Sequence, residues 1–327
     1  MEENAAYFSA RISAMKETLF PMLTYEKMLL MELPEITRYI SEGDYHDDVL
    51  ELSKSFKGID LIEYALNLNL ARTYQKLLNI SGGNIHKFII QYMRRWDIEN
   101  IKSILRGLSS GVSSQEIVET LIPVGSMKFT YLISLTKMDY KAAKTDLEEK
   151  KIIPPEYESI PDLENEIDRR YFQRSIKIAK EIGEEGLIRF LYKEIDLHNL
   201  KILLRLKKEG TDFELIKNEL IPLGKRITKR SYKVLGDLNF EGTIQFANRQ
   251  FNNMRLDPEE NITIIEQELD KYLISFGERV SHLNMFSTLT ALGFILRKYR
   301  EIANLRLIVR GKQLGLPPES IEKMLVV

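Results

Sequence analysis

The sequence contains no cysteine among its 327 residues. This excludes disulfides, thiolate zinc sites, iron–sulfur clusters and cysteine nucleophiles, and it is compatible with a reducing cytoplasm. The four histidines are scattered, and no two of them have the spacing of metal ligands. The sequence also lacks the G-x-x-x-x-G-K-[ST] loop that cradles nucleotide phosphates. We therefore expect no catalytic residue, no metal site and no bound cofactor.

Neither sign of charge is in excess, because 47 Lys and Arg oppose 48 Asp and Glu. A protein that coats nucleic acid is usually strongly basic, so that class is disfavoured. A membrane-spanning helix needs about 20 mostly apolar residues. The longest uncharged run, residues 280–296, is shorter, includes polar residues and is predicted to be a buried helix. The acidic N-terminus does not have the pattern of a signal peptide.

One motif occurs three times at intervals of about 100 residues. Each copy has an acid, an asparagine three positions later, and a basic residue two and six positions after the asparagine. The acid and asparagine pairs are Asp97 with Asn100, Asp196 with Asn199, and Glu301 with Asn304. The first two copies end in Pro-x-Gly. We predict three homologous domains, at 1–123, 124–222 and 223–327.

Each copy is predicted to be helical, so the fold class is all-α. The positions one, four and five after each asparagine are apolar, which is one face of a helix: Ile101, Ile104, Leu105; Leu200, Leu203, Leu204; Leu305, Ile308, Val309. Gly111, Gly210 and Gly315 follow where a helix would end. Ser113 with Glu116 and Thr211 with Glu214 are candidate capping boxes for a second helix.

Two further helices are predicted at the ends of the sequence. The residues Phe8, Ile12, Met15 and Leu19, followed by Met22 or Leu23, have the spacing of one opening helix. In the third copy, Ile321, Leu325 and the terminal valines match core positions of the first copy. We therefore expect the C-terminal segment to pack as structure, in part against the first domain.

The motif acids project into the apolar stripe if the helix advances about 100° per residue. A buried acid needs partners, because an unpaired buried charge is costly. The acids are either catalytic carboxylates or braces for an adjoining helix. We favour braces, because catalytic sites are rarely copied in triplicate. The asparagines are interpreted as amide braces to a neighbouring backbone.

The basic residues of the motif project away from the apolar stripe. They are Lys102, Arg106, Lys201, Arg205, Arg306 and Arg310. They form a solvated face, or local pairs with acids, or else a collar that contacts a partner, a role that suits arginine.

Two other charged clusters have possible functional interpretations. The basic segment 225–233 suits nucleic acid or lipid headgroups, but no aromatic residues alternate with its cations. The segment Asp47-Asp48-Val49-Leu50-Glu51 is similar to a DDxxD metal motif of isoprenoid synthases, yet it ends in Glu and has no second acidic motif. In a helix, Asp47 and Glu51 would be solvated neighbours.

The sequence resembles the C subunits of archaeal-type (A-type) and V-type ATP synthases, equivalent to the d subunits of eukaryotic vacuolar ATPases. The resemblance covers the whole chain. It rests on Ala6-Tyr7-x-x-Ala10-Arg11, on Tyr25-Glu26-Lys27-Met28-Leu29 and above all on the triplicate motif, whose third copy has Glu301 in place of Asp.

This resemblance implies three similar helical domains around a pseudo-threefold axis, shaped like a funnel. It implies a non-catalytic subunit of the central stalk, which couples the proteolipid rotor ring to the central shaft and transmits torque for ATP synthesis or ion transport. The implied partners are the ring subunits, the shaft subunits and the cytoplasmic face of the cell membrane, with the chain monomeric in the complex and without nucleic acid. A generic helical-repeat scaffold for a soluble protein partner is the alternative.

Overall fold

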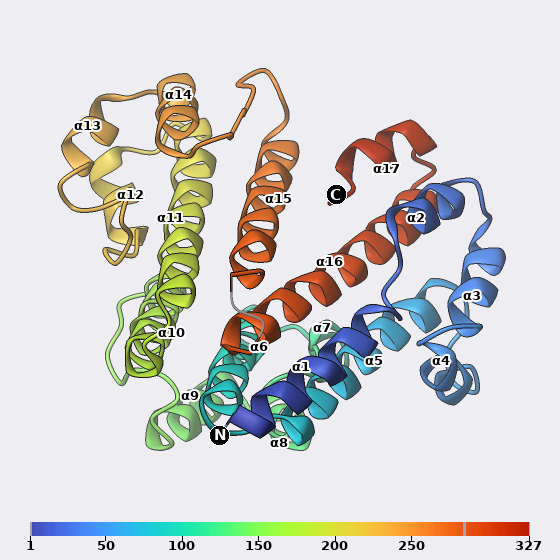
Figure 1. Ribbon diagram of the computed structural model, residues 1–327. Helices are drawn as coiled ribbons and strands as arrows, with labels where there is room; N and C mark the ends of the chain where they lie inside the picture. The colour runs from blue at the N-terminus through green and yellow to red at the C-terminus, as the bar shows by residue number, and fades with distance from the viewer. Residues whose placement is uncertain (1, 284–285, 327) are drawn as a thin grey trace. The chain divides into compact units, whose positions relative to one another are not determined.

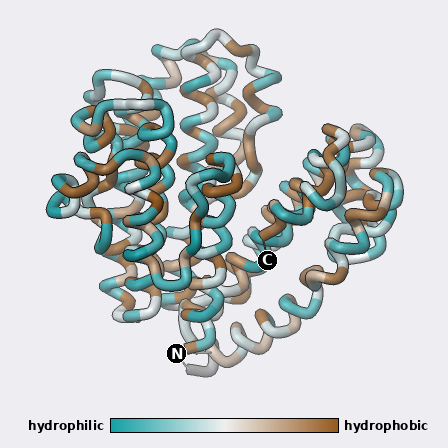
Figure 2. The backbone as a smooth tube through the Cα atoms, turned by 90° about the horizontal axis from the view of Figure 1, so that it is seen from above, coloured by the Kyte–Doolittle hydropathy of each residue, from teal (hydrophilic) through white to brown (hydrophobic). Residues whose placement is uncertain are grey.

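The computed structural model describes residues 2–283 and 286–326. Within these ranges the chain forms seventeen α-helices and no strand, which confirms the all-α prediction (Figure 1). Along the tube in Figure 2, hydrophobic and hydrophilic residues alternate within individual helices. Most helices are therefore amphipathic and bury one face.

The helices divide into two compact units. The first joins the segments before Lys87 and after Phe251. It contains α1 (Glu2–Lys16), α2 (Met22–Leu29), α3 (Leu33–Ser41), α4 (His46–Leu52), α5 (Gly58–Ile80), α15 (Ile262–Ser281), α16 (Thr288–Gln313) and α17 (Pro318–Met324). The second comprises residues 87–251. It contains most of α6 (Gly83–Ser109), then α7 (Ser114–Thr120), α8 (Phe129–Thr136), α9 (Tyr140–Glu149), α10 (Ile160–Ile182), α11 (Glu185–Lys208), α12 (Phe213–Glu219), α13 (Tyr232–Asp237) and α14 (Phe240–Gln250).

Helix α16 is the centre of the first unit. It packs against α1, α2, α5, α15 and α17, while α3 and α4 pack on α5. Every residue from Thr288 to Leu296 is buried, so this part of α16 is covered on all sides. Its motif residues Leu305, Ile308 and Val309 are buried as the sequence predicts.

The second unit is built on the helical hairpin of α10 and α11, which Gly183 joins with a left-handed φ of 80°. Helix α11 also packs against α12 and α14, and α7 packs against α8. The stripe residues Ile101, Ile104 and Leu105 lie in one apolar cluster with residues of α7 to α10. The copies of the motif stripe in both units are thus core residues.

The three motif helices end in the same way. Gly111, Gly210 and Gly315 all have positive φ, between 68° and 76°, directly after the motif helices. The capping box of Ser113 and Glu116 is confirmed. The box predicted at Thr211 is wrong, because Asp212 caps α12 by accepting from the amide of Glu214. Asp212 is the residue that aligns with Ser113, so the repeat alignment identifies the cap better than the local pattern.

Two predicted helices are wrong in their extent. The opening helix ends at Lys16, and Pro21 precedes the separate helix α2, so Leu19 and Met22 do not continue α1. The run 280–296 is not one helix either. Helix α15 ends at Ser281 and α16 begins at Thr288, where the Ser287 hydroxyl accepts from the amide of Leu289 at 3.1 Å. Part of that run, residues 284–285, lies outside the described residues.

The compact units and the sequence repeats are divided at different positions. One unit boundary falls within α6 and the other follows Phe251. The repeats at 1–123, 124–222 and 223–327 rest on sequence similarity. The division into three homologous domains stays a prediction.

Candidate functional site

The acid of the first motif holds the chain segment that leads into α8. Asp97 is 2% exposed, and its carboxylate accepts from the amide of Ser126 (2.9 Å), the hydroxyl of Ser126 (2.6 Å) and the amide of Met127 (3.0 Å). Gly125 has a φ of 139°, and a Cβ there would overlap the carboxylate of Asp97. The glycine of the Pro-x-Gly link is therefore required by this close approach.

The second acid repeats the arrangement before α13. Asp196 is 2% exposed and accepts from the amides of Arg226 and Ile227, each at 3.0 Å. A Cβ at Gly224 would overlap its carboxylate. Burial raises the pKa of Asp97 and of Asp196 above the ordinary aspartate value, and the hydrogen bonds that they accept offset part of this effect.

The third acid reaches the corresponding segment at the start of the chain. Glu301 accepts from the amide of Phe20 (2.7 Å), the hydroxyl of Tyr45 (2.6 Å) and the ammonium of Lys298 (2.7 Å). Phe20 precedes α2 as Ser126 precedes α8, since a Thr-Tyr pair follows each residue at the same distance. The acid of the third copy thus holds a segment of the first, and in all three copies the acid accepts hydrogen bonds from the segment that a brace would hold.

Each motif asparagine holds the backbone of the residue 22 positions later. Its side-chain amide donates to that residue's carbonyl, and its side-chain oxygen accepts from the same residue's N–H. The pairs are Asn100 with Ile122, Asn199 with Ile221 and Asn304 with Val326, with all six distances between 2.8 and 2.9 Å. The asparagines are at most 2% exposed. The prediction of amide braces is confirmed.

A basic residue three positions before each acid is a part of the motif that the sequence analysis missed. These residues are Arg94, Lys193 and Lys298. Lys298 and Glu301 form an ion pair in which both side chains are 2% exposed. Arg94 and Lys193 lower the pKa of Asp97 and Asp196 through their charge, although burial has the larger effect. The i, i+3 spacing is the signal that indicates these pairs.

Equivalent positions of the first two copies also meet in the second unit. Arg95 and Glu194 each lie two residues before their motif acid, and they pair at 2.9 Å. Arg95 donates a further hydrogen bond to the hydroxyl of Tyr171 at 2.9 Å. This contact joins α6, α10 and α11, and the sequence does not reveal it because it requires the folded positions of three helices.

The six basic residues proposed as a collar do not form one exposed face. Lys102 lies opposite the apolar stripe, yet it is only 6% exposed and pairs with Asp168 of α10 at 2.6 Å. Arg106 pairs with Glu164 at 2.6 Å. The expected solvent exposure is therefore wrong for Lys102, and the alternative of local acid pairs is observed here.

The third copy shows the same kind of pairing within the first unit. Arg306 donates to the side chain of Asn67 at 2.8 Å, and Arg310 binds both oxygens of Glu63. Arg310 remains largely exposed, with 59% of its side chain accessible. In the second copy, Lys201 is partly buried and Arg205 is exposed. A partner contact by these basic residues stays a prediction.

The acidic cluster of α4 makes contacts with α5. Asp48 is 2% exposed, accepts from the amide of Asn69 at 2.8 Å and pairs with Arg72 at 2.9 Å. Glu51 contacts the same guanidinium at 2.5 Å. Across residues 2–283 and 286–326, no group of three or more acidic or histidine side chains is arranged to hold a metal ion.

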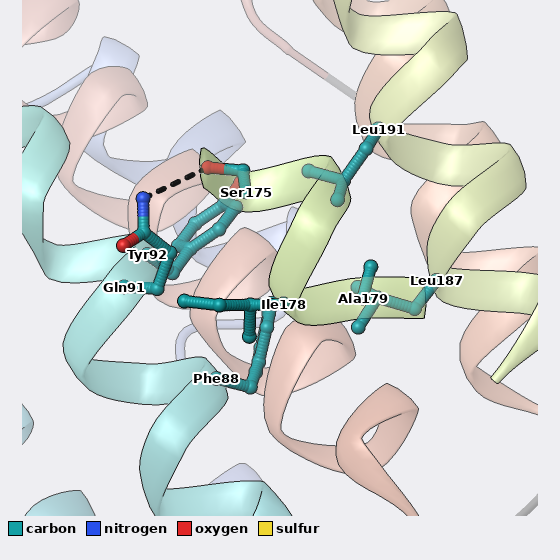
Figure 3. Close-up of a pocket in the computed structure, with 8 residues that line it drawn as sticks. All are labelled: Phe88, Gln91, Tyr92, Ser175, Ile178, Ala179, Leu187 and Leu191. Atoms are coloured by element: carbon teal, nitrogen blue, oxygen red, sulfur yellow. Dashed lines mark hydrogen bonds between the residues drawn. The ribbon is translucent and has the colours of Figure 1, made fainter. Parts of the chain in front are cut away.

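A small pocket lies among α6, α10 and α11 (Figure 3). Its only drawn hydrogen bond joins the side-chain amide of Gln91 to the hydroxyl of Ser175 at 3.0 Å. It has room for about one water molecule and is lined by Phe88, Gln91, Tyr92, Ser175, Ile178, Ala179, Leu187 and Leu191. A pocket of this size does not hold an organic substrate.

None of the helices in the described part of the chain has the length and apolar character needed to cross a bilayer. The motif acids and asparagines hold chain segments against the motif helices. The site is therefore a set of three repeated braces with exposed charge around them.

Comparison with known proteins gives one consistent result. Residues 8–324 match the family described as ATP synthase (C/AC39) subunit. The C subunit of the A-type ATP synthase from Methanococcoides burtonii is 33% identical over 99% of this chain and 94% of its own length. The C subunits of the A-type ATP synthases from Methanosarcina acetivorans and Archaeoglobus fulgidus are 34% and 31% identical, over 99% and 98% of this chain and 93% and 96% of their own lengths.

Proposed function

We propose, from the premise that this chain belongs to the ATP synthase (C/AC39) subunit family, that it is a non-catalytic rotor subunit of the central stalk. In this role it joins the proteolipid ring in the membrane to the central shaft and rotates with both. It transmits torque between ion movement through the ring and ATP synthesis or hydrolysis in the head. The observation that carries the proposal is the family match over nearly the whole chain.

The three braces support a mechanical role. A subunit that transmits torque must resist bending between its parts. Each motif helix holds two chain segments, one through its acid and one through its asparagine, and these acid and asparagine side chains are at most 2% exposed. Buried and fully satisfied polar networks make a structure rigid. The funnel of three domains implied by the family resemblance belongs to the same proposal.

The proposed partners are the ring subunits and the shaft subunits, with the chain monomeric and peripheral on the cytoplasmic face of the membrane. A subunit that docks on a ring does not need its own span, and the described helices offer none. Its exposed arginines, including Arg106 and Arg310, supply charge for these contacts. Interface charges of this kind contribute to specificity and to the rate of association.

The test is a pull-down with the tagged full-length chain from detergent-solubilised membranes of the source organism, followed by identification of the copurifying chains. The proposal predicts proteolipid and shaft subunits in the same eluate. Recovery of soluble proteins alone, with no ring or shaft subunit, would replace it by the alternative of a helical-repeat scaffold.

A further inference from the structure

We propose that the basic segment at 225–233, in the second compact unit, is a docking surface for anionic phospholipid headgroups. The segment carries five cations within nine residues: Lys225, Arg226, Lys229, Arg230 and Lys233. All five are exposed. No acidic residue occurs between Glu219 and Asp237, so the segment has no negative charge of its own.

These cations differ from the basic residues of the triplicate motif because they have no acidic partner. Within the described residues, none of the five forms an ion pair. Lys225 lies over the ring of Tyr192 at 4.8 Å, and Arg226 contacts the side-chain oxygen of Gln250 at 3.5 Å. Both partners are uncharged. The positive charge of the segment is therefore available to a partner, whereas Lys102 of the motif is buried and paired with Asp168.

The segment is held in a defined conformation. The buried carboxylate of Asp196 binds the amides of Arg226 and Ile227, and the Ile227 side chain is fully buried. The hydroxyl of Ser231 accepts from the amide of Thr228 at 2.9 Å and donates to its carbonyl at 2.8 Å. A surface that is ordered before binding loses less conformational entropy on docking.

Two exposed apolar side chains accompany the cations. Val234 follows Lys233 directly and is 54% exposed, and Leu215 on the adjoining helix α12 is 62% exposed. Lysine and arginine at headgroup level combined with apolar side chains that reach the acyl boundary are typical of surfaces that bind a bilayer. A nucleic-acid partner fits less well, because Tyr232 is the one aromatic residue within the segment and its ring already packs against Phe213 in a T-shaped contact.

The basic segment occurs in only one copy of the repeat. Each of the three acids holds an equivalent segment, but residues 20–27 contain one cation and residues 126–137 contain two. The braces do not require the charge, since the other two copies form them without it. This asymmetry indicates a function separate from folding, and the inference builds on the peripheral membrane position proposed above.

The experiment measures flotation of the purified full-length chain with vesicles of phosphatidylcholine, alone or mixed with phosphatidylglycerol. The test variant combines Lys229→Gln, Arg230→Gln and Lys233→Gln. The matched control combines Lys54→Gln, Lys57→Gln and Lys76→Gln, which removes three exposed cations from elsewhere and changes the net charge equally. Melting curves of both variants are recorded to show that they fold.

We expect the wild type and the control to bind the anionic vesicles and not the neutral ones. Each basic residue near an anionic surface strengthens binding about fivefold, so the test variant should bind roughly a hundredfold more weakly. At high salt, where the electrostatic attraction to the vesicles is screened, the variant that combines Leu215→Ser with Val234→Ser should bind more weakly than the wild type.

Failure of the wild type to bind anionic vesicles would overturn the inference, as would equal loss in the test and control variants. Tighter binding to a single-stranded oligonucleotide than to the vesicles would overturn it in favour of nucleic acid. The pull-down in detergent contains no bilayer, so it tests the proposed function without testing lipid binding. If the chain copurifies with ring and shaft subunits but does not bind vesicles, this inference alone is contradicted. Vesicle binding without copurification would contradict the proposed function alone.

Discussion

At the scale of single residues, the fold depends on two side chains per motif that act on different segments. The acid and the asparagine lie three positions apart on one helix, so they share a face. The asparagine holds the helix that ends its own copy, and the acid holds the segment that opens the next copy. Glu301 closes this sequence of contacts by holding Phe20. The three motifs therefore connect the repeats as well as stabilising them.

Replacement of a motif asparagine should destabilise the protein strongly. Asn199→Leu leaves the N–H and the carbonyl of Ile221 buried and unpaired, and each such group costs about 1–3 kcal/mol. We expect a loss of about 2–5 kcal/mol in urea unfolding. Asn252→Ala, at an exposed position, is the control and should cost less than about 0.5 kcal/mol. A loss below about 1 kcal/mol for Asn199→Leu would contradict the bracing role.

His198 should make stability depend on pH. Burial lowers its pKa to about 4 from an ordinary value of 6.5, and the charges of Lys102 and Lys201 contribute. As the pH falls, the His198 imidazole is therefore protonated near pH 6.5 in the unfolded chain but only near pH 4 in the folded chain. The contribution of His198 to the free energy of unfolding is fully present above pH 6.5. It decreases by about 1–3 kcal/mol as the pH falls toward 4.

The matched measurement compares the free energy of unfolding of the wild type and His198→Gln between about pH 4 and pH 7. The difference between the two proteins should change with pH, while acids with raised pKa values contribute equally to both and cancel. His282→Gln, at an exposed histidine, should retain the slope of the wild type. Parallel curves for the wild type and His198→Gln would show that His198 is protonated equally in both states.

The residue roles are partly visible in the sequence. The bracing acids and asparagines are predictable, because three copies of a polar residue on an apolar face require partners. The partners themselves are not predictable, since Phe20 and Glu301 are far apart along the chain. Arg95 with Glu194 likewise depends on helices that only the folded structure brings together.

At the scale of helices, a periodic apolar pattern identifies a helix better than it identifies its ends. The motif helices are predictable with their terminal glycines, because a left-handed residue marks the end in all three copies. The opening stripe continues in register from α1 into α2, although Pro21 separates the two helices. The apolar pattern can continue across a break between two helices, so capping residues indicate the helix ends better than the pattern does.

The C-terminal helix should be essential for stability. Ile321 and Leu325 are at most 1% exposed, α17 packs against α2 and α16, and Val326 is the partner of Asn304. The contact with α2 confirms that this segment packs on the start of the chain; Val327 lies outside the described residues. Removal of the residues after Pro318 deletes three buried aliphatic side chains, each worth about 1.5–3 kcal/mol.

We expect the truncated chain to lose at least about 4 kcal/mol or to become insoluble, since typical proteins have only about 5–15 kcal/mol of stability. The control is Glu319→Gln with Glu322→Gln, which alters exposed positions of the same helix and should melt near the wild type. An unchanged melting temperature for the truncated chain would show that α17 contributes no packing energy.

At the scale of the whole molecule, the distribution of charge separates structural from available cations. Lys102 and Arg306 are mostly buried and have acidic or amide partners within their own unit, while the cations of the segment 225–233 are exposed and have no acidic partner among the described residues. The sequence locates both groups but does not distinguish them, because the pairing acids lie on other helices. The family resemblance and the triplicate motif, by contrast, are readable from the sequence alone.

Charge reversal of the exposed motif arginines should affect assembly more than folding. The variant combines Arg106→Glu, Arg205→Glu and Arg310→Glu. Exposed ion pairs such as that of Arg106 with Glu164 contribute about 0–1 kcal/mol each, so the variant should remain folded. Interface charges that lose a partner cost about 2–5 kcal/mol of binding, so copurification with ring and shaft subunits should be lost.

Lys54→Glu, Lys57→Glu and Lys76→Glu provide the control with the same change in net charge, and this variant should assemble normally. Full assembly of the arginine variant would show that these arginines serve only their intramolecular pairs.

The most direct test of the adapter role is the coupling of ATP hydrolysis to ion transport in vesicles reconstituted with the ATP synthase. Two preparations are compared, one complete and one depleted of this chain, and the purified chain is then added back. We predict that the depleted complex hydrolyses ATP without ion accumulation and that the added chain restores transport. Ion transport at the full rate without this chain would contradict the account.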